Sequence, residues 1–223
     1  MTTPEETYWE KANKTKMGTY ITDMEMTFLF SSVNSLKCGL VADLGAGAGR
    51  FSIPLAKNNT NVAAIDISLH GLKRLKYKNK DVNTVLGDVK AIPLRDNMFD
   101  AIVMIELLDC VLELEYVLTE CWRILKPEGL IVFSFGNESS LKGKLKGLFK
   151  KPYLHSYQEV LRYLDSIGFR IVRKEGFNWL PFNRSSDNPL IPLFAKIEGL
   201  LGPRKPISIS PWVMMHAIKS TKR

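Results

Sequence analysis

Two aspartates and a run of glycines have the spacing of a nucleoside-binding site. The glycine-rich run Gly45–Gly49 directly follows the apolar run Leu40–Leu44. A strand, a glycine turn and a helix in succession let a backbone approach a ligand closely. Asp66 ends a second apolar run about 20 residues further on, where a carboxylate can accept hydrogen bonds from both hydroxyls of a ribose. Asp88 follows a third apolar run and can accept a hydrogen bond from an adenine amino group.

The residues next to the glycines favour one of two possible nucleotide ligands, a dinucleotide or a nucleoside that carries a cationic group. A dinucleotide site of the Gly-x-Gly-x-x-Gly type needs a glycine where Arg50 stands. Asp43 would repel a pyrophosphate, whereas its carboxylate suits a ligand that carries a cationic ammonium and sulfonium. A third interpretation is that the turn only packs a helix against a sheet, with Asp88 as a helix cap.

The sequence does not fix a catalytic residue. A general base is required only when the reacting group of the acceptor is protonated at the working pH. No catalytic triad and no metal-ligand spacing is recognisable, so no metal is expected. A lone histidine is more often a hydrogen-bonded structural residue than a base. The candidate bases are Glu106, Asp109, His155 and His216, followed by Tyr157 and His70.

Three blocks of sequence share a resemblance to one family. Asp-Leu-Gly-Ala-Gly-Ala-Gly, from residue 43 to 49, resembles the first motif of class I S-adenosylmethionine (SAM) dependent methyltransferases. Gly-Asp-x-x-x-Ile-Pro-Leu from residue 87, with Phe-Asp-x-Ile from residue 99, resembles the second block of their small-molecule, type 11-like branch. Arg-Ile-Leu-Lys-Pro-Glu-Gly-Leu-Ile-Val from residue 123 resembles the segment that joins a helix to the fifth strand. The three blocks cover residues 40–135.

The resemblance implies a fold and a cofactor. The fold is α/β, a Rossmann-like doubly wound sheet of seven mostly parallel strands in the order 3-2-1-4-5-7-6, with the last strand antiparallel. The cofactor is SAM, with Ile67 and Val89 beside the adenine ring and a leading segment that closes over the ligand. The expected cofactor-binding residues are Asp43, Gly45, Ala46, Gly47, Asp66, Ile67, Gly87, Asp88, Val89, Glu106 and Tyr20.

Hydrophobic periodicity and cap signals locate the elements that must position these residues. Helices are expected at 8–12, 21–33, 50–56, 69–75, 112–125 and 157–167, with Lys16, Gly18 and Tyr20 on the loop between the first two. Ser68 and the Ser156–Glu159 capping box should begin two of these helices, and Gly168 should end the last one. Strands are expected at 40–44, 62–66, 82–86, 99–103, 130–135 and from 169, and the final strand should span 208–218.

One domain, residues 1–223, should contain a helical cap (1–38), a SAM-binding core (40–135) and two acceptor-side insertions (136–157 and 179–207). Lysines surround an apolar helical stripe between 141 and 151, as in segments that lie on anionic membranes or grip phosphate. The second insertion is unusually apolar and should contain a helix from Leu190 to Leu201. In the family that the sequence resembles, such additions commonly cap the acceptor pocket, and an apolar cap favours an apolar or amphiphilic, lipid-like acceptor. Burial of the insertion against the core or a dimer partner is an equally good interpretation.

The net charge and the cysteines indicate which classes of binding partner and which cellular location are compatible with the sequence. The chain has 223 residues, a formal net charge of +8 and a sequence pI near 9.3, which admit RNA, phosphate or an acidic membrane as partner. Cys38, Cys110 and Cys121 lack metal-ligand or Cys-x-x-Cys spacing, and no signal peptide is recognisable, so a reducing cytoplasmic location is expected. No pattern fixes an oligomeric state.

The prediction is therefore a SAM-dependent methyltransferase that acts on a small or amphiphilic acceptor. The alternatives are an RNA methyltransferase, which net charge alone favours, and a SAM-binding protein without catalysis. A nicotinamide oxidoreductase fits Asp43, Arg50 and Asp88 poorly. Family members that methylate base amino groups carry an Asn/Asp-Pro-Pro-aromatic loop after the fourth strand, which this chain lacks. Cys110 also lacks the flanking proline of the nucleophile in pyrimidine-C5 methyltransferases.

Overall fold

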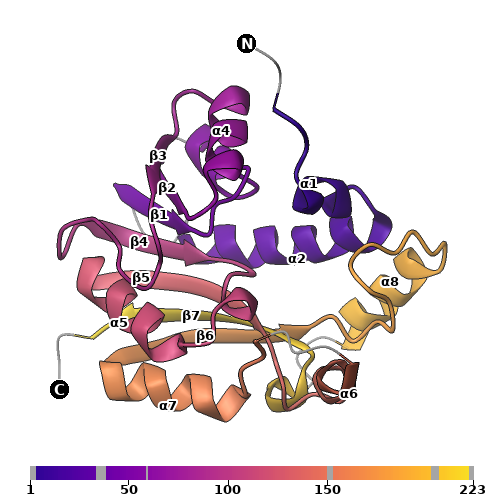
Figure 1. The fold of residues 1–223 in the computed structure, drawn as a ribbon. Helices are drawn as coiled ribbons and strands as arrows, with labels where there is room; N and C mark the ends of the chain where they lie inside the picture. Colours follow the sequence, from indigo (N-terminus) through magenta and orange to yellow (C-terminus); the bar gives the residue numbers. More distant parts are fainter. Residues whose placement is uncertain (1–3, 34–38, 59, 150–152, 202–205, 221–223) are drawn as a thin grey trace.

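A seven-stranded sheet forms the centre of the molecule (Figure 1). The computed structural model describes residues 4–33, 39–58, 60–149, 153–201 and 206–220. Its strand order is the predicted 3-2-1-4-5-7-6, and β7 runs antiparallel to both of its neighbours. The strands are β1 (Leu40–Leu44), β2 (Asn61–Asp66), β3 (Asn83–Leu86), β4 (Phe99–Met104), β5 (Leu125–Gly136), β6 (Phe169–Phe177) and β7 (Trp212–Lys219).

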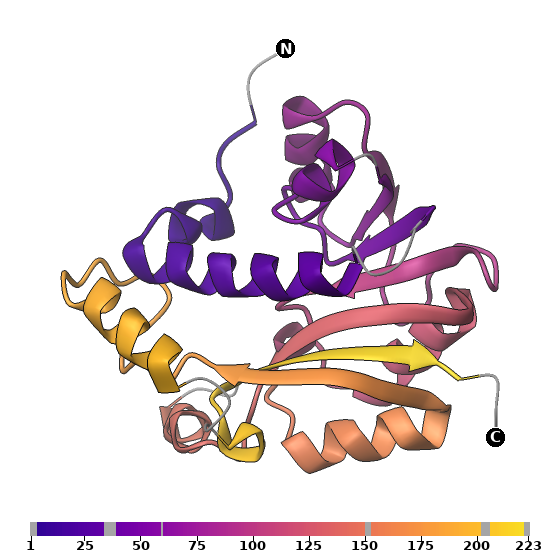
Figure 2. The same cartoon turned by 180° about the vertical axis from the view of Figure 1, so that it is seen from behind.

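Helices cover both faces of the sheet, because successive side chains of a buried strand point to opposite sides. On one face Val41 and Val62 join a core with α2, α3 and α4, and Figure 2 shows α2 lying across the sheet. On the other face Ala42 and Ala63 join a core with α5 and α7. The helices are α1 (Tyr8–Asn13), α2 (Lys16–Val33), α3 (Ser52–Lys57), α4 (Leu69–Lys78), α5 (Leu114–Ile124), α6 (Leu141–Phe149), α7 (Tyr157–Ile167) and α8 (Ile191–Leu201).

The structure confirms the helix ends that were predicted from capping residues. The Ser68 hydroxyl accepts a hydrogen bond from Gly71 N at the start of α4, and the Ser156 hydroxyl accepts one from Glu159 N at the start of α7. Gly168 ends α7 in the left-handed conformation, with φ 105°. The expected helix in the apolar insertion is α8. Cys38 and the lysines at 150 and 151 lie outside the described residues.

The prediction of a loop at Lys16, Gly18 and Tyr20 was wrong, since all three lie in α2. The turn between α1 and α2 is tighter than the hydrophobic pattern indicated. A Cβ atom at Gly18 would lie 2.0 Å from the carbonyl oxygen of Ala12, so the two helices meet at a distance that only glycine allows.

Three element boundaries also differ from prediction. Ser208–Ser210 do not belong to the last strand, because residues 207–209 form a 3₁₀ turn and Asn137 Nδ2 donates to the carbonyl oxygens of Ser208 and Ser210. The fifth strand begins at Leu125, before the predicted start, where the Lys126–Asp100 ion pair ties it to β4 at 2.8 Å. The helix after the glycines begins at Ser52, so Arg50 lies in the turn itself.

The amino end of α2 is completed by residues far away in the sequence. The first backbone N–H groups of a helix lack partners within the helix. Here Lys16 N donates to Asp187 Oδ1 at 2.9 Å and Met17 N donates to the carbonyl oxygen of Ser186 at 3.0 Å. Thr15 Oγ1 donates to the carbonyl oxygen of Arg184 at 2.7 Å. We call residues 184–187 the α2 strap, because this segment fastens the second insertion to the N-terminal helices.

Replacement of Asp187 by alanine should therefore destabilise the protein. Loss of a helix-capping carboxylate costs about 1 kcal/mol, and urea denaturation would measure the change in the free energy of unfolding. Asp23→Ala is the matched control, since Asp23 is an exposed residue of the same helix. Equal stability of the Asp187→Ala variant and the control would contradict the strap.

Candidate functional site

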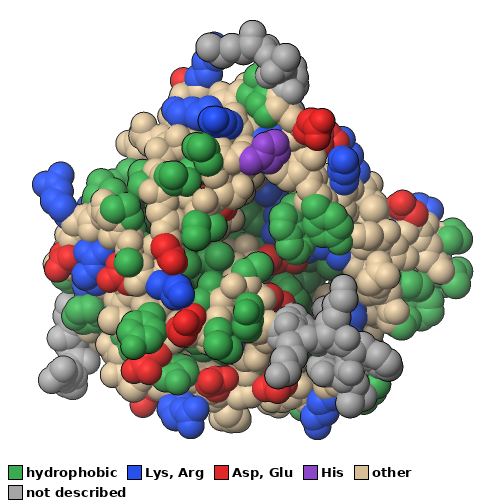
Figure 3. Space-filling model, in the orientation of Figure 1, with side chains coloured by type: hydrophobic (Ala, Val, Ile, Leu, Met, Phe, Trp, Pro, Cys, Tyr) green, Lys and Arg blue, Asp and Glu red, His purple; other side chains and the backbone are tan. Residues whose placement is uncertain are grey.

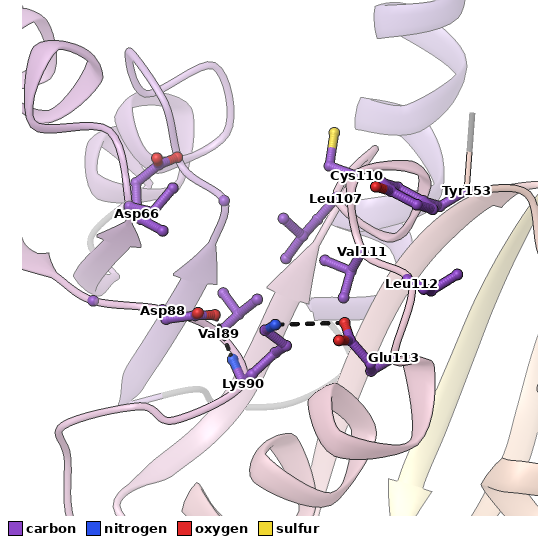
Figure 4. Close-up of a pocket in the computed structure, with 13 residues that line it drawn as sticks. Asp66, Asp88, Val89, Lys90, Leu107, Cys110, Val111, Leu112, Glu113 and Tyr153 are labelled. Carbon is purple, nitrogen blue, oxygen red and sulfur yellow. Dashed lines mark hydrogen bonds and ion pairs between the residues drawn. The ribbon is translucent and has the colours of Figure 1, made fainter. Parts of the chain in front are cut away.

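A cavity of about 410 Å³ opens at the carboxyl ends of β1 to β4, where open α/β sheets bind their ligands. Figure 3 shows the hollow in the centre of one face, and Figure 4 shows the side chains around it. Its lining residues are Gly45, Asp66, Ile67, Gly87, Asp88, Val89, Lys90, Leu107, Cys110, Val111, Leu112, Glu113 and Tyr153.

The glycine turn brings the backbone to the floor of this cavity. Gly45 and Gly47 have φ values of 71° and 50°, which disfavour side chains. A Cβ atom at Gly45 would lie 2.8 Å from Leu107 Cδ1, whereas one at Gly47 would meet nothing within 4 Å. The Ala46 amide is used structurally, since its N–H donates to the Ile65 carbonyl oxygen at 3.2 Å. The space above Gly47 is therefore open for a ligand.

Asp66 is held in a fixed orientation at the end of β2. Its Oδ2 accepts a hydrogen bond from Gly47 N at 2.7 Å, and its Oδ1 accepts one from Ser68 N at 2.6 Å. Each carboxylate oxygen has a second lone pair, which remains available to a pair of neighbouring hydroxyl groups. The two backbone donors thus hold the Asp66 carboxylate in the fixed orientation that the predicted role of a ribose acceptor requires.

Asp88 lies on the same wall, beyond β3. Its Oδ1 accepts from Lys90 N at 2.9 Å, which fixes the side chain in a local turn. Val89 lies next to Asp88 (Figure 4), and Ile67 also lines the cavity. Ile67 is 73% exposed, an unusual value for isoleucine that a flat aromatic ring bound against it would lower. Two carboxylate acceptors beside apolar side chains match the hydrogen-bond donors and the flat ring of an adenosine moiety.

The opposite wall is mainly apolar and comes from the chain after β4. Leu107 and Val111 point toward the wall that contains the two aspartates, whereas Leu112 points away from it (Figure 4). Tyr153 adds an aromatic ring from the first insertion. Glu113 belongs to this wall and pairs with Lys90 at 3.4 Å. Sequence analysis did not identify this wall. Its signal was the position of residues 107–113 after a buried parallel strand, because that sheet edge is where ligands bind.

Cys110 is an exposed thiol on this apolar wall. Desolvation by burial, and then the negative charge of Asp109, raise the pKa of the thiol above its ordinary value. The thiol is therefore protonated at neutral pH, when a nucleophile would have to be a thiolate. This environment agrees with the low priority that the sequence gives to Cys110 as a nucleophile.

Four charged side chains meet behind the glycine turn. Arg50 pairs with Glu25 of α2 at 3.1 Å and with Glu106 at 2.7 Å. Arg184 of the α2 strap also pairs with Glu106 and donates to Asn13 Oδ1 at 2.7 Å. All four are largely buried, and Glu25 is completely so. Burial and the nearby charge of Glu106 raise the pKa of Glu25 above its ordinary value, whereas the positive charges of Arg50 and Arg184 oppose this rise and favour the carboxylate.

This four-residue charge cluster contains one of the expected site residues, Glu106. Glu106 has a φ of 58°, and its N–H donates to Ser134 Oγ at 2.9 Å, so the backbone is bent to present the carboxylate to both arginines. Glu106 does not line the cavity, although the next residue, Leu107, does.

Asp43 and Tyr20 lie outside the cavity lining. Asp43 is 2% exposed and accepts a hydrogen bond from Ser52 Oγ at the start of α3. Desolvation by burial raises the pKa of Asp43 to about 7. Burial also raises the pKa of Tyr20, which faces Glu198 of α8. Both side chains have the contacts of structural residues at the edge of the site.

The candidate bases are held by structural contacts. Asp109 Oδ1 accepts from Gly136 N at 2.8 Å, and His155 Nε2 lies 3.0 Å from the Val111 carbonyl oxygen. These two residues therefore brace the apolar wall rather than line it. His216 is buried on β7, where desolvation lowers its pKa. The lower-priority candidates are also outside the cavity lining: His70 is exposed on α4 and Tyr157 is buried on α7.

The burial of Asp43 predicts a pH-dependent effect on stability. An acid whose pKa rises from 3.8 to about 7 on folding destabilises the folded state as pH increases through that interval. The Asp43→Asn variant cannot lose this proton. Its free energy of unfolding relative to wild type should rise between about pH 4 and 7, by up to about 3 kcal/mol.

Asp100→Asn is the control, because the pKa of Asp100 is shifted in the opposite direction to that of Asp43. Burial alone would raise the pKa of Asp100, but hydrogen bonds from Lys126 and Leu40 N bring it below its ordinary value. Asp100 therefore stabilises the fold above about pH 4, and this contribution is lost as the pH falls. Urea denaturation at several pH values would measure both variants, and a flat difference for Asp43→Asn would disprove its assignment as a buried, protonated group.

Comparison with known proteins agrees with this geometry. Residues 42–133 match the family described as "Methyltransferase domain". A demethylmenaquinone methyltransferase of Renibacterium salmoninarum is 33% identical over 150 residues, which are 67% of this chain and 54% of that protein. The match thus spans about half the length of that relative. A ubiquinone biosynthesis O-methyltransferase of Coxiella burnetii is 24% identical, covering 81% of this chain and 84% of that protein.

Solved structures share the fold. The magnesium protoporphyrin IX methyltransferase of Synechocystis, crystallised with bound S-adenosylhomocysteine (SAH), superposes with a TM-score of 0.68 at 17% identity. The match covers 97% of this chain and 89% of that one. Residues 42–133 therefore belong to the methyltransferase domain family, and the chain as a whole has the fold of the class I SAM-dependent methyltransferases.

Proposed function

We propose that the protein transfers the methyl group of SAM to an apolar aromatic acceptor of the quinol class, the reduced form of a quinone, which loses a proton as it gains the methyl group while SAM becomes SAH. One observation carries the proposal. A single cavity has a nucleoside wall with two oriented carboxylates and, opposite it, an apolar wall of aliphatic and aromatic side chains. The relatives named for quinone methylation support the choice of acceptor class.

The nucleoside wall is proposed to hold the cofactor. Asp66 would accept hydrogen bonds from the ribose hydroxyls, Asp88 from the adenine amino group, and Ile67 and Val89 would contact the ring. The open space at Gly47 would let the rest of the cofactor lie against the turn. When bound, SAM supplies a methyl group that its sulfonium already activates for transfer.

The apolar wall is proposed to position the acceptor. Leu107 and Val111 are braced through Asp109 and His155, so this wall is fixed before an acceptor enters. A flat ring packed there would be desolvated and directed toward the cofactor side. Alignment and exclusion of water are the main requirements for this reaction, because the leaving group needs no further activation. That requirement explains why the cavity contains an oriented binding surface and no triad.

The first test concerns Asp66. Asp66→Ala removes a charged acceptor of two hydrogen bonds, each of which is worth about 1.5–3 kcal/mol. Titration calorimetry should show SAH binding weakened at least roughly tenfold. Asp81→Ala is the control, because Asp81 is an exposed aspartate outside the cavity lining. Unchanged SAH affinity in Asp66→Ala would refute the nucleoside assignment.

The second test concerns the acceptor. Leu112→Asn makes the apolar wall more polar at its mouth and should lower kcat/KM for a tail-less naphthoquinol by roughly tenfold, as expected for one leucine side chain. The SAH affinity should not change. Val172→Asn alters an exposed apolar residue of β6 and serves as the control. Methyl transfer to RNA but to no quinol would instead support the nucleic-acid alternative.

A further inference from the structure

Helix α8 has the reverse of the usual arrangement of polar and apolar side chains. Leu193, Ile197 and Leu200 form one stripe with i, i+4, i+7 spacing, and they are 57%, 45% and 80% exposed. The opposite stripe contains Ile191 and Glu198, which are 1% and 4% exposed. A helix at the surface of a globular protein normally buries its aliphatic stripe and exposes its acid.

Helix α6 shows the same reversal. Leu141 and Leu145, one turn apart, are 75% and 52% exposed. Lys142 between them points inward, where its Nζ donates to Asn178 Oδ1 at 2.9 Å and to the carbonyl oxygens of Leu180 and Phe182 at 3.0 Å. These bonds attach α6 to the segment that leads to α8. Figures 1 and 2 both show the two helices at the same end of the molecule.

The charged side chains described as exposed on these two helices are positive. Lys144 of α6 and Lys196 of α8 are exposed. Glu198 is the single acidic residue in the sequence of both helices, and it is buried. Trp179, Leu190 and Phe194 extend the exposed apolar area around α8. We call this combination of exposed apolar and basic side chains on α6 and α8 the α6–α8 surface.

We propose that the α6–α8 surface docks on an anionic lipid bilayer. A bilayer interface accepts both features at once, since its acyl region takes the leucine stripe and its phosphate layer attracts the flanking lysines. A protein partner would need an acidic rim around an apolar groove, whereas anionic lipids supply the negative charge without specific geometry. Within the described residues, no helix is long and apolar enough to cross a membrane, so the contact is at the surface.

The α6–α8 surface is connected along the chain to the residues that form the cavity. Tyr153, which lines the apolar wall of the cavity, follows α6 closely in the sequence. The α2 strap and α8 belong to the same insertion, so α8 is also fastened to the N-terminal helices beside the glycine turn. The inference goes beyond the proposed function, because it concerns the lipid surface and does not depend on which acceptor is methylated.

Vesicle flotation tests the proposal. The full-length protein is mixed with vesicles of phosphatidylcholine alone or of phosphatidylcholine with phosphatidylglycerol, and the floated fraction is measured. Wild type should float with the anionic vesicles and much less with the neutral ones. Leu193→Ser/Leu200→Ser should reduce the partition coefficient at least roughly tenfold. Lys144→Glu/Lys196→Glu should reduce it roughly tenfold or more on anionic vesicles, with little effect on neutral ones.

Matched variants elsewhere separate this effect from general damage. Val172→Ser removes an exposed apolar side chain on β6 and Lys73→Glu reverses an exposed charge on α4, and both should float like wild type. Absence of wild-type protein from the floated fraction would overturn the proposal. So would a stable dimer in light scattering that Leu193→Ser/Leu200→Ser dissociates, because the surface would then join two copies of the chain.

The tests of the two proposals are independent. SAH titration and turnover of a tail-less naphthoquinol take place in solution without vesicles. Leu193→Ser/Leu200→Ser should leave both unchanged while it abolishes flotation. Asp66→Ala should float normally while it loses SAH binding.

Discussion

The ion pairs of Arg50 with Glu25 and Glu106 are the interaction on which the site depends. Arg50 belongs to the glycine turn, Glu25 to α2 and Glu106 to the bend after β4. Arg184, which belongs to the second insertion, pairs with Glu106 and so connects that insertion to the same cluster. Charges buried to this extent are tolerated only when they are paired, because desolvation of a lone charge costs several kcal/mol. The cluster therefore holds the cap, the turn and the apolar wall in one fixed arrangement around the cavity.

Much of the fold followed from local patterns. The glycine run, the acids after the second and third strands and the helix caps at Ser68 and Ser156 act over a few residues, so their sequence neighbourhood contains the necessary information. The strand order came from the family resemblance of residues 40–135. Asp66, Asp88, Ile67 and Val89 were expected beside one ligand, and they line one cavity.

The remaining features depend on tertiary contacts that no local pattern encodes. Asp43 accepts a hydrogen bond from Ser52 at the start of α3, a partner that the apolar run around Asp43 does not indicate, and its expected role in cofactor binding stays a prediction. Tyr20 was expected on a loop, and the close approach of Gly18 to Ala12 places it in a helix. The apolar wall was not identified because residues 107–113 resemble an ordinary loop until Asp109 and His155 attach them to the sheet.

The α2 strap has a consequence for the order in which the molecule is made. Lys16 N and Asp187 Oδ1 are separated by 171 positions in the chain. During synthesis on a ribosome, the N-terminal helices emerge long before the segment that completes them. The first amides of α2 therefore stay bonded to water until residues 186 and 187 have been synthesised, when most of the polypeptide has left the ribosome. Maturation of the ligand-binding face is thus a late event, coupled to the arrival of the last quarter of the chain.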